Sequence, residues 1–474
     1  MQVQPPQPTQ PSMEDAGARP EDGPLHFDVA VAGGGVGGLA LATRLAREGR
    51  RVAVVERAEP GTFRVGESLD WEAPVFLARL GFDVERWVAE GKATFKGGAV
   101  VSNAAQPGVR AEIGFSAPFR ALMTLVGRAS PTIHANRELV DVDLFEAARG
   151  AGARFFRAKV RAVEREGDRV GALLLDDGRR LTAAYYVDAT GAAALFRRAF
   201  GIGQDEIGPR KVVVRARFPH AYDGLGTRIR TDDTLSEAAW IWDIHVSDGV
   251  TDVGIVVAER DFAALRKRLG SLRAIFLHQC LKHDDLAWIE PLVTEDTELW
   301  TCSFQNMVSH GSSGPNWIAV GEAAFVVDAI LSSGFTMSLR TGFRAADLVS
   351  EALRKGAPQL SRLGRRIYHE KTRAQVRTID GLIDVLWYRG RLREHYSLMM
   401  NVVSILFFNF NLNHLHTRWT PRTRLELAAL LALHGAIDRF ARAYDRTLHA
   451  LARRRGLRNP NFAPALAREA GAEA

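Results

Sequence analysis

One segment near the N-terminus constrains the fold of this chain more than any other. Residues 27–32 form an apolar run typical of a β-strand, and residues 33–38 read Gly-Gly-Gly-Val-Gly-Gly. Helical patterning follows at 39–48, and a second β-type run at 51–55 ends at Glu56. Strand, glycine turn, helix, strand and a terminal acidic residue form the fingerprint of a dinucleotide-binding βαβ unit. The sequence therefore predicts an α/β domain that binds a dinucleotide.

Each part of this fingerprint has its own physical role. Gly33 permits the tight turn, Gly35 lets the backbone approach a pyrophosphate, and Gly38 lets the helix pack closely on the strand. The helix N-terminus after the glycine turn offers unpaired N–H groups to the phosphates, and Val36 within the turn is a candidate cofactor-binding residue. Glu56 is expected to accept hydrogen bonds from a ribose. A glycine turn alone can arise by chance, but the intact context favours the nucleotide site.

The rest of the chain divides by composition and pattern. Residues 1–24 are rich in proline and polar residues, which predicts a disordered tail. Runs of β character at 211–218, 239–246 and 253–258 predict a mostly antiparallel sheet. From residue 341 onward helical patterning dominates.

Charge and cysteine content limit the classes of function. The net charge is +7, with most of the basic excess after residue 351, but no nucleic-acid-binding motif accompanies it. A solvated, arginine-rich helical face explains this excess equally well. Cys280 and Cys302 are too few for a disulfide scaffold or a cysteine-rich metal site, so we expect a cytoplasmic protein without a metal. The apolar stretch 398–412 is interrupted by polar residues, and no transmembrane helix is predicted.

Several further segments together carry a family resemblance. Three of them are Val-Gly-Glu-Ser-Leu at 65–69, Trp-Ile-Trp-Asp-Ile-His at 240–245 and Asp-Ala-Ile-Leu-Ser-Ser-Gly at 328–334. The segments 136–141, 188–191 and 320–324 add features of a broader superfamily. With the glycine fingerprint, they resemble the flavin-dependent halogenases within the FAD-dependent aromatic hydroxylase superfamily. Leu331 stands where tryptophan-type members carry a glutamate, so the resemblance points to enzymes that halogenate phenols or pyrroles.

The resemblance implies a fold and a cofactor. A discontinuous, Rossmann-like FAD-binding domain is expected over 25–345, because strands near 188 and 318 return to it. An inserted, mostly antiparallel substrate sheet is expected at about 205–300, and a C-terminal helical region over 346–474. The residues that the resemblance assigns to FAD are Gly33, Gly35, Val36, Gly38, Glu56, Glu67, Ser68, Arg137, Glu322, Ser333 and Gly334.

The resemblance also implies a mechanism. In the family, reduced FAD and oxygen give a flavin hydroperoxide, which oxidises a halide to hypohalous acid that a lysine then holds near the substrate. Lys96 matches this lysine in its position after the 65–69 segment, with Lys92 as the alternative. Ser333 and Gly334 are expected to bind the halide through backbone N–H groups.

The tandem tryptophans have two interpretations. Trp240 and Trp242 alternate along an apparent strand, where they either pack the sheet or, as in the family, shield the flavin from the substrate. Asp243 and His245 share the opposite face and are candidates for an acid and a base, although solvent exposure or local hydrogen bonding is the commoner explanation.

Three residues depart from the family pattern. His245 and Ala329 replace prolines, and Glu322 replaces an aspartate. Because proline fixes φ and removes a hydrogen-bond donor, the segments 240–245 and 328–334 are expected to follow a different backbone path from that of the family.

FADH2-dependent halogenation of a small aromatic substrate is the leading functional hypothesis, with a halide ion and a separate flavin reductase as partners. Whether the substrate is free or bound to a carrier protein stays open. An NAD(P)H-using aromatic hydroxylase or other flavin oxidoreductase is the alternative. A third hypothesis is a binding module whose basic C-terminal helices dock a carrier protein or a membrane.

Overall fold

The computed structural model describes residues 25–62, 65–103, 110–113, 132–221, 226–232, 235, 239–247 and 249–383, with 425, 428, 432 and 439. The predicted tail at 1–24, the apolar stretch at 398–412 and most of the predicted C-terminal helical region lie outside the described residues. Within the described part, no helix is both long enough and apolar enough to cross a bilayer.

A seven-stranded sheet forms the first layer. Its order is β7 (Arg154–Arg157), β2 (Val52–Glu56), β1 (Leu25–Ala32), β10 (Arg180–Asp188), β9 (Arg169–Leu175) and β8 (Val160–Glu166), with β16 (Trp317–Ala319) paired to β10. The strands β7, β2, β1, β10 and β16 run parallel, whereas β9 and β8 form an antiparallel extension. Because β10 and β16 come from distant parts of the chain, this layer is discontinuous in sequence, as predicted.

An eight-stranded sheet forms the second layer. Its order is β17 (Phe325–Val326), β15 (Trp300–Ser309), β11 (Gln204–Pro219), β14 (Val250–Ala258), β13 (Ala239–Ser247), β12 (Gly226–Asp232), β4 (Gly98–Asn103) and β5 (Arg110–Ile113). All neighbours are antiparallel except β12 and β4. The predicted runs 211–218, 239–246 and 253–258 lie in three central strands of this sheet. Strands outside the range 205–300 complete it.

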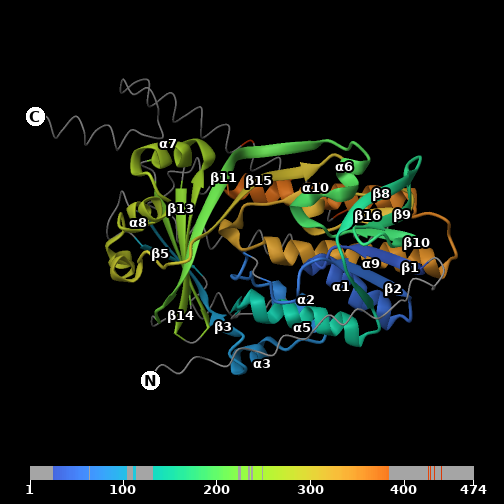
Figure 1. Cartoon of the computed structure of the whole chain (residues 1–474), viewed down its shortest axis with the longest axis horizontal. Helices are drawn as coiled ribbons and strands as arrows, with labels where there is room; N and C mark the ends of the chain where they lie inside the picture. The colour runs from blue at the N-terminus through green and yellow to red at the C-terminus, as the bar shows by residue number, and fades with distance from the viewer. Residues whose placement is uncertain are drawn as a thin grey trace, which may run out of the picture.

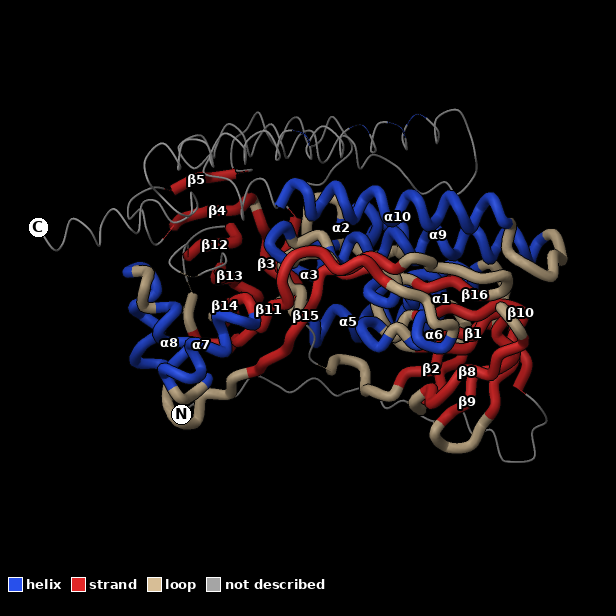
Figure 2. Tube along the Cα trace, turned by 90° about the horizontal axis from the view of Figure 1, so that it is seen from above, coloured by secondary structure: helices blue, strands red, loops and turns tan. Residues whose placement is uncertain are grey.

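The helices connect and cover these layers (Figure 1). They are α1 (Val36–Arg47), α2 (Ala73–Arg79), α3 (Val84–Ala89), α5 (Arg137–Gly150), α6 (Leu195–Ala199), α7 (Glu259–Leu269), α8 (Leu272–Cys280), α9 (Gly334–Arg354) and α10 (Arg362–Ile383). Short 3-10 turns are η1 (Gly191–Ala193), η2 (Asp284–Leu292), η3 (Gly321–Ala323) and η4 (Ala329–Leu331), and a small third sheet pairs β3 (Ala93–Lys96) with β6 (Thr132–Ala135). Figure 2 shows α9 and α10 as two long helices that lie side by side.

The two faces of the eight-stranded sheet pack against different parts of the protein. Ile241 and Ile255 face outward and pack with Leu265 and Phe276 of the covering helices α7 and α8. The opposite face carries both tryptophans of β13 and joins the apolar cluster around the 328–334 loop. The alternation along β13 therefore follows the sequence prediction, and the α/β fold class is confirmed.

Candidate functional site

The carboxyl ends of three parallel strands meet at one edge of the first sheet. Ala32 pairs with Asp188, and Asp188 pairs with Ala319, so the turns after β1, β10 and β16 converge there. Gly33 has φ +96°, and a Cβ at this position would lie 2.4 Å from the carbonyl oxygen of Ala189. Only glycine fits this turn, which places the glycine segment where α/β proteins bind nucleotides.

The N-terminus of α1 suits an anion. Its N-cap residue Gly35 supplies no side chain, and the first turn from Val36 contains no acidic residue. The helix dipole and the first N–H groups are therefore available to a pyrophosphate. Glu56 lies beside this turn and accepts hydrogen bonds from the main-chain nitrogens of Gly34 (2.6 Å) and Ala58 (2.9 Å). These residues fit a bound dinucleotide.

Glycines also allow close packing around α1. A Cβ at Gly38 would lie 2.6 Å from Cβ of Ala189, which matches the packing role predicted for this glycine. A Cβ at Gly342 of α9 would lie 2.2 Å from the carbonyl oxygen of Gly37, and a Cβ at Gly37 would lie 2.7 Å from that of Ser338. The helices α1 and α9 are thus in main-chain contact.

Lys96 is buried at the end of β3. Its Nζ donates to Ser68 Oγ (2.8 Å), to the carbonyl oxygen of Leu69 (3.0 Å) and to Ser332 Oγ (3.4 Å). Ser332 Oγ in turn donates to Ser68 Oγ (3.0 Å). The structure therefore brings together three separate sequence segments around one ammonium group: 65–69, β3 and the 328–334 loop.

The surroundings change the acidity of Lys96. Burial lowers the pKa of its ammonium to about 8, although the carboxylate of Asp70 opposes this shift. The Trp71 ring lies 5.6 Å from Nζ. Lys92, by contrast, is partly exposed and forms ion pairs with Glu90 (3.0 Å) and Asp143 (2.8 Å). Of the two lysines, Lys96 is the one with the environment of a reactive amine.

The 328–334 loop is anchored at both ends. Asp328 is buried, pairs with Lys211 Nζ (2.9 Å) and caps η4 by accepting from the main-chain nitrogen of Ile330 (3.1 Å). This turn forms with Ala329 in place of the family's proline. Ser332 adopts a left-handed conformation with φ +57°, which directs its hydroxyl to Lys96. Ser333 follows as the N-cap of α9, and its buried Oγ has no hydrogen-bond partner among the described residues.

The two tryptophans of β13 belong to the cluster that lines this loop. Trp240 and Trp242 have ring centroids 5.7 Å apart and share an apolar cluster with Trp71, Ile330 and other residues. Trp242 Nε1 donates to Asp252 Oδ1 (2.7 Å). Both rings therefore pack the sheet on the face that meets the loop, so their packing and shielding interpretations do not exclude each other.

Their neighbours on the opposite face are Asp243 and His245. Asp243 is buried and accepts from Arg230 Nη2 (3.2 Å), while the carbonyl oxygen of half-buried His245 accepts from Thr94 Oγ1. Asp243 is thus tied into an ion pair.

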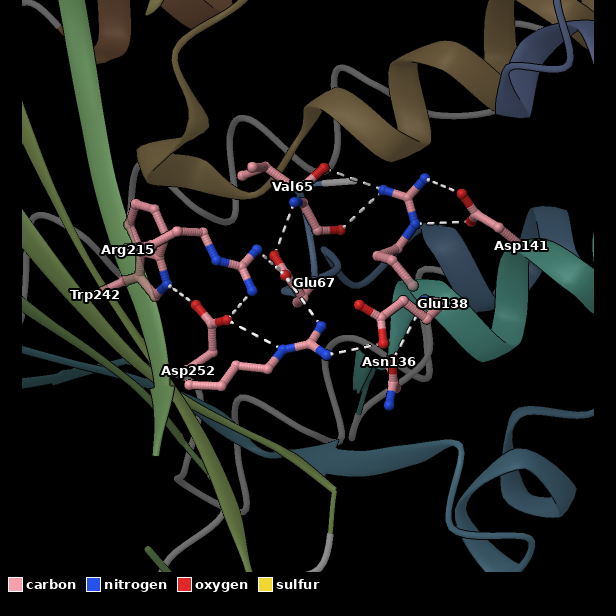
Figure 3. A network of polar contacts seen from close by, with 11 residues as sticks. Val65, Glu67, Asn136, Glu138, Asp141, Arg215, Trp242 and Asp252 are labelled. Atoms are coloured by element: carbon pink, nitrogen blue, oxygen red, sulfur yellow. Dashed lines mark hydrogen bonds and ion pairs between the residues drawn. The ribbon is translucent and has the colours of Figure 1, made fainter. Parts of the chain in front are cut away.

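Glu67 is part of a buried ionic network (Figure 3). Its Oε1 pairs with Arg215 Nη1, and Arg215 Nη2 pairs with Asp252. Arg217 lies 3.5 Å from Asp252 and pairs with Glu138 (3.1 Å). Burial, followed by the charge of Glu67, raises the pKa of Asp252 above its usual range. The network joins the second sheet to the 65–69 segment.

Arg137, at the start of α5, binds the first two residues of the 65–69 segment. Its Nε and Nη2 each donate to Asp141 at 2.8 Å, and Nη1 donates to the carbonyl oxygens of Val65 and Gly66 at 3.3 Å (Figure 3). Burial opposes its charge, but Asp141 outweighs burial and raises the pKa of Arg137. Neither Arg137 nor Glu67 is exposed to solvent, whereas Glu322, another charged residue predicted to bind FAD, is exposed and lies near Gly191.

Several residues of the Lys96 environment carry no signal in the sequence. His134 Nε2 lies 2.8 Å from Thr227 Oγ1, which lies 3.1 Å from Ser68 Oγ. Asp70 accepts from Thr336 Oγ1 (2.6 Å), and burial raises the pKa of this carboxyl group. These contacts join distant strands, so no local spacing could predict them.

Comparison with known proteins identifies the family of this chain. The sequence profile of the tryptophan halogenase family matches residues 28–118 and 104–341. A tryptophan 2-halogenase of Chondromyces crocatus is 24% identical over 355 residues, which cover 70% of this chain and 62% of that protein. A 1H-pyrrole-2-carbonyl-[peptidyl-carrier protein] chlorinase of Pseudomonas fluorescens is 23% identical over 442 residues, covering 85% and 88% of the two chains.

Solved structures show the same fold. The structure of the flavin-dependent brominase Bmp2 superimposes with a TM-score of 0.70 at 19% identity, covering 88% of this chain and all of that chain (100%). The family profile spans well over half of the sequence and includes the glycine fingerprint, Lys96 and the 328–334 loop. The chain therefore belongs to the tryptophan halogenase family, and it is a flavin-dependent oxidoreductase whose cofactor is FAD.

Proposed function

We propose that this protein halogenates an electron-rich aromatic substrate of the phenol or pyrrole type, and that Lys96 is its active-site amine. The observation that carries this proposal is the burial of Lys96 against the 328–334 loop, with a pKa of about 8. Reduced FAD supplies the oxidation of halide by oxygen. The residues of the chain then control where the resulting hypohalous acid reacts.

Lys96 can act in two ways. As an ammonium it donates hydrogen bonds that polarise hypohalous acid, and as a neutral amine it attacks the halogen to form a haloamine. A pKa near 8 makes both forms accessible close to neutral pH. Ser333 and Gly334, at the start of α9, are proposed to hold the halide, and the unpartnered hydroxyl of Ser333 offers it a donor.

The remaining assignments complete the proposed site. Trp240 and Trp242 separate the flavin side of the loop from the substrate. We propose that Gly33, Gly35, Val36, Gly38 and Glu56 bind the FAD nucleotide, and that Glu67, Ser68, Arg137 and Glu322 contribute to its site from the positions described above.

The substrate is proposed to arrive on a carrier protein, with a separate reductase supplying the reduced flavin. Two relatives are named for carrier-bound substrates, the pyrrole chlorinase and a 1H-pyrrole-2-carbonyl-[peptidyl-carrier protein] brominase of Pseudoalteromonas luteoviolacea, which is 24% identical over 351 residues. The test offers the protein one pyrrole-2-carbonyl substrate twice, free and attached to a peptidyl carrier protein. Faster halogenation of the free form would overturn the carrier assignment.

A supplied-flavin assay separates halogenation from hydroxylation. With FADH2, oxygen and chloride or bromide, we expect halide-dependent product from a panel of phenols, pyrroles and indoles, measured by mass spectrometry. NADPH consumption without a reductase, together with a halide-independent hydroxylated product, would instead identify a hydroxylase. The hydroxylase alternative is supported by one relative, an aurachin C monooxygenase/isomerase of Stigmatella aurantiaca, which is 31% identical over 169 residues.

The pyrophosphate site is tested at Gly35. We expect Gly35→Val to lose bound FAD, because a side chain at the N-cap of α1 occupies the space where the phosphates approach the backbone. Flavin absorbance of the purified protein measures the loss, and Gly150→Ala, at the end of α5 where an added Cβ meets open space, is the control. A wild-type flavin content in Gly35→Val would refute this position for the pyrophosphate.

A further inference from the structure

A continuous line of hydrogen bonds leads from Lys96 to a buried histidine. Lys96 Nζ lies 2.8 Å from Ser68 Oγ, Ser68 Oγ lies 3.1 Å from Thr227 Oγ1, and Thr227 Oγ1 lies 2.8 Å from His134 Nε2. All four side chains are buried, with exposed fractions of 9% or less. The line crosses from the 65–69 segment to strand β12 and ends on β6.

The donors in this line can have only one order. Ser68 Oγ accepts from Lys96 and from Ser332, so its own proton goes to Thr227 Oγ1. Among the described residues, His134 Nε2 is then the acceptor within reach of the Thr227 hydroxyl, which favours Nε2 as the unprotonated ring nitrogen.

The far side of the imidazole requires the same tautomer. Thr94 Oγ1 lies 3.5 Å from His134 Nδ1, but its own proton is donated to the carbonyl oxygen of His245. Thr94 is thus an acceptor toward His134, and Nδ1 carries the proton. The contacts at both ring nitrogens favour the tautomer in which Nε2 accepts a proton from the line that starts at Lys96.

We infer that Ser68, Thr227 and His134 form a proton relay that removes a proton from the Lys96 ammonium. In the relay step, the Lys96 N–H bond breaks and its proton binds Ser68 Oγ. The hydroxyl proton of Ser68 moves to Thr227, and that of Thr227 moves to His134 Nε2. Lys96 is left with a lone pair and His134 with a positive charge, so protons and charge balance without an oxidant. His134 acts through Lys96 and is a positioning residue of the reaction.

The charged groups around the relay fit this role. Burial lowers the pKa of His134 well below its usual value, and the charges of Lys96 and His245 lower it further, so the ring is neutral and holds a relayed proton only transiently. The titratable groups that face the relay are Lys96 on β3, His245 on β13 and Asp70, which faces Lys96. His245 is half-buried, and its carbonyl oxygen accepts from Thr94 Oγ1. The inference rests on the proposed role of Lys96 in halogenation.

The first experiment measures the pH dependence of organic halide formation with supplied FADH2. In the wild type, we expect the rate to rise as pH passes through about 8, where Lys96 loses its proton. Thr227→Val removes the central hydroxyl at nearly constant volume and should lower the rate by about 10²-fold and flatten this rise. Thr227→Ser restores the hydroxyl and should recover most of the rate and its pH profile.

The matched control is Thr231→Val on the same strand. Thr231 is buried, and its hydroxyl donates to the carbonyl oxygen of Ser102 (3.3 Å), away from the relay. This variant should keep the wild-type pH profile. Hypohalous acid captured by a small scavenger should stay at wild-type levels in Thr227→Val, because the relay acts after the flavin step. An unchanged pH profile in Thr227→Val would overturn the relay.

The second experiment observes the tautomer of His134 directly and does not depend on turnover. The FAD-bound protein is labelled with ¹⁵N-histidine, and the signal lost in His134→Gln identifies residue 134. We expect the proton on Nδ1 between pH 6 and 8, and a shift toward Nε2 in Thr227→Val. A wild-type proton on Nε2 would refute the relay even if Lys96 is essential. If the wild-type protein forms no organic halide, the proposed function is refuted. The tautomer of His134 in the same protein still tests the relay separately.

Discussion

Replacing Lys96 with alanine is expected to lower organic halide formation by at least about 10³-fold while FAD stays bound. The ammonium contacts Ser68, Leu69 and Ser332 of the 328–334 loop, whereas the amine of Lys211 is paired with Asp328 at the start of that loop. The assay supplies FADH2, oxygen and halide, and measures organic halide and free hypohalous acid separately. Continued release of hypohalous acid without organic product would place Lys96 after the flavin step.

Two further variants sharpen this result. Lys96→Arg should not restore activity through a haloamine, because a guanidinium stays protonated; partial activity would favour polarisation by hydrogen bonds. Lys92→Ala is the matched control, since Lys92 forms only ion pairs with Glu90 and Asp143 at the surface. Full product formation by Lys96→Ala would eliminate the proposed role.

The second large effect is expected from Arg215→Met in the buried ionic network. Arg215 bridges Glu67 and Asp252, and all three side chains are almost completely buried. Removing the guanidinium leaves two carboxylates facing each other, which costs about 3–5 kcal/mol of the free energy of unfolding. Denaturant unfolding at pH 7 measures this loss.

The pH dependence of the same variant gives an independent check. The pKa of Asp252 is raised in the folded protein, so the folded state binds more protons than the unfolded state between the two pKa values. Stability therefore falls as pH rises through this window, and in Arg215→Met the fall should extend to higher pH, because loss of the guanidinium raises the pKa of Asp252 further.

Arg210→Met is the control for both measurements. Arg210 lies on the same strand, but half of its side chain is exposed and its partner Glu259 lies 3.7 Å away. Exposed ion pairs contribute little, so the unfolding curve should be nearly unchanged. Equal stability of the Arg215 and Arg210 variants would show that the buried network contributes nothing to the fold.

Local patterns predicted the parts of this fold whose contacts are local. The strand, glycine turn and helix at 27–48 follow from short-range geometry, and the structure begins α1 at Val36 rather than at residue 39. The parallel pairing of β4 with β12 was not predictable, because it joins residues about 130 positions apart and neither strand has a distinctive pattern.

The same limit applies to the site. Lys96 was identified from its position after the 65–69 segment, and the structure adds the burial that distinguishes it from Lys92. The sequence drew attention to Ser333, whereas Ser332 contacts Lys96, because the backbone of Ser332 turns left-handed at that residue. His134 reaches the site through strand pairing alone, and only a three-dimensional structure could reveal it.

The glycine contact between α1 and α9 has a consequence for changing substrate preference. Helix α1 begins at the proposed phosphate site, and helix α9 begins at the end of the 328–334 loop. Gly37 and Gly342 bring the main chains of these two helices together. The proposed phosphate site and the proposed halide site are thus held by one closely packed pair of helices, whereas Trp240 and Trp242 belong to a separate sheet. Directed evolution confined to β13, and to β12 apart from Thr227, should therefore diversify substrates without disturbing the proposed flavin site, while libraries that touch either glycine should lose the cofactor.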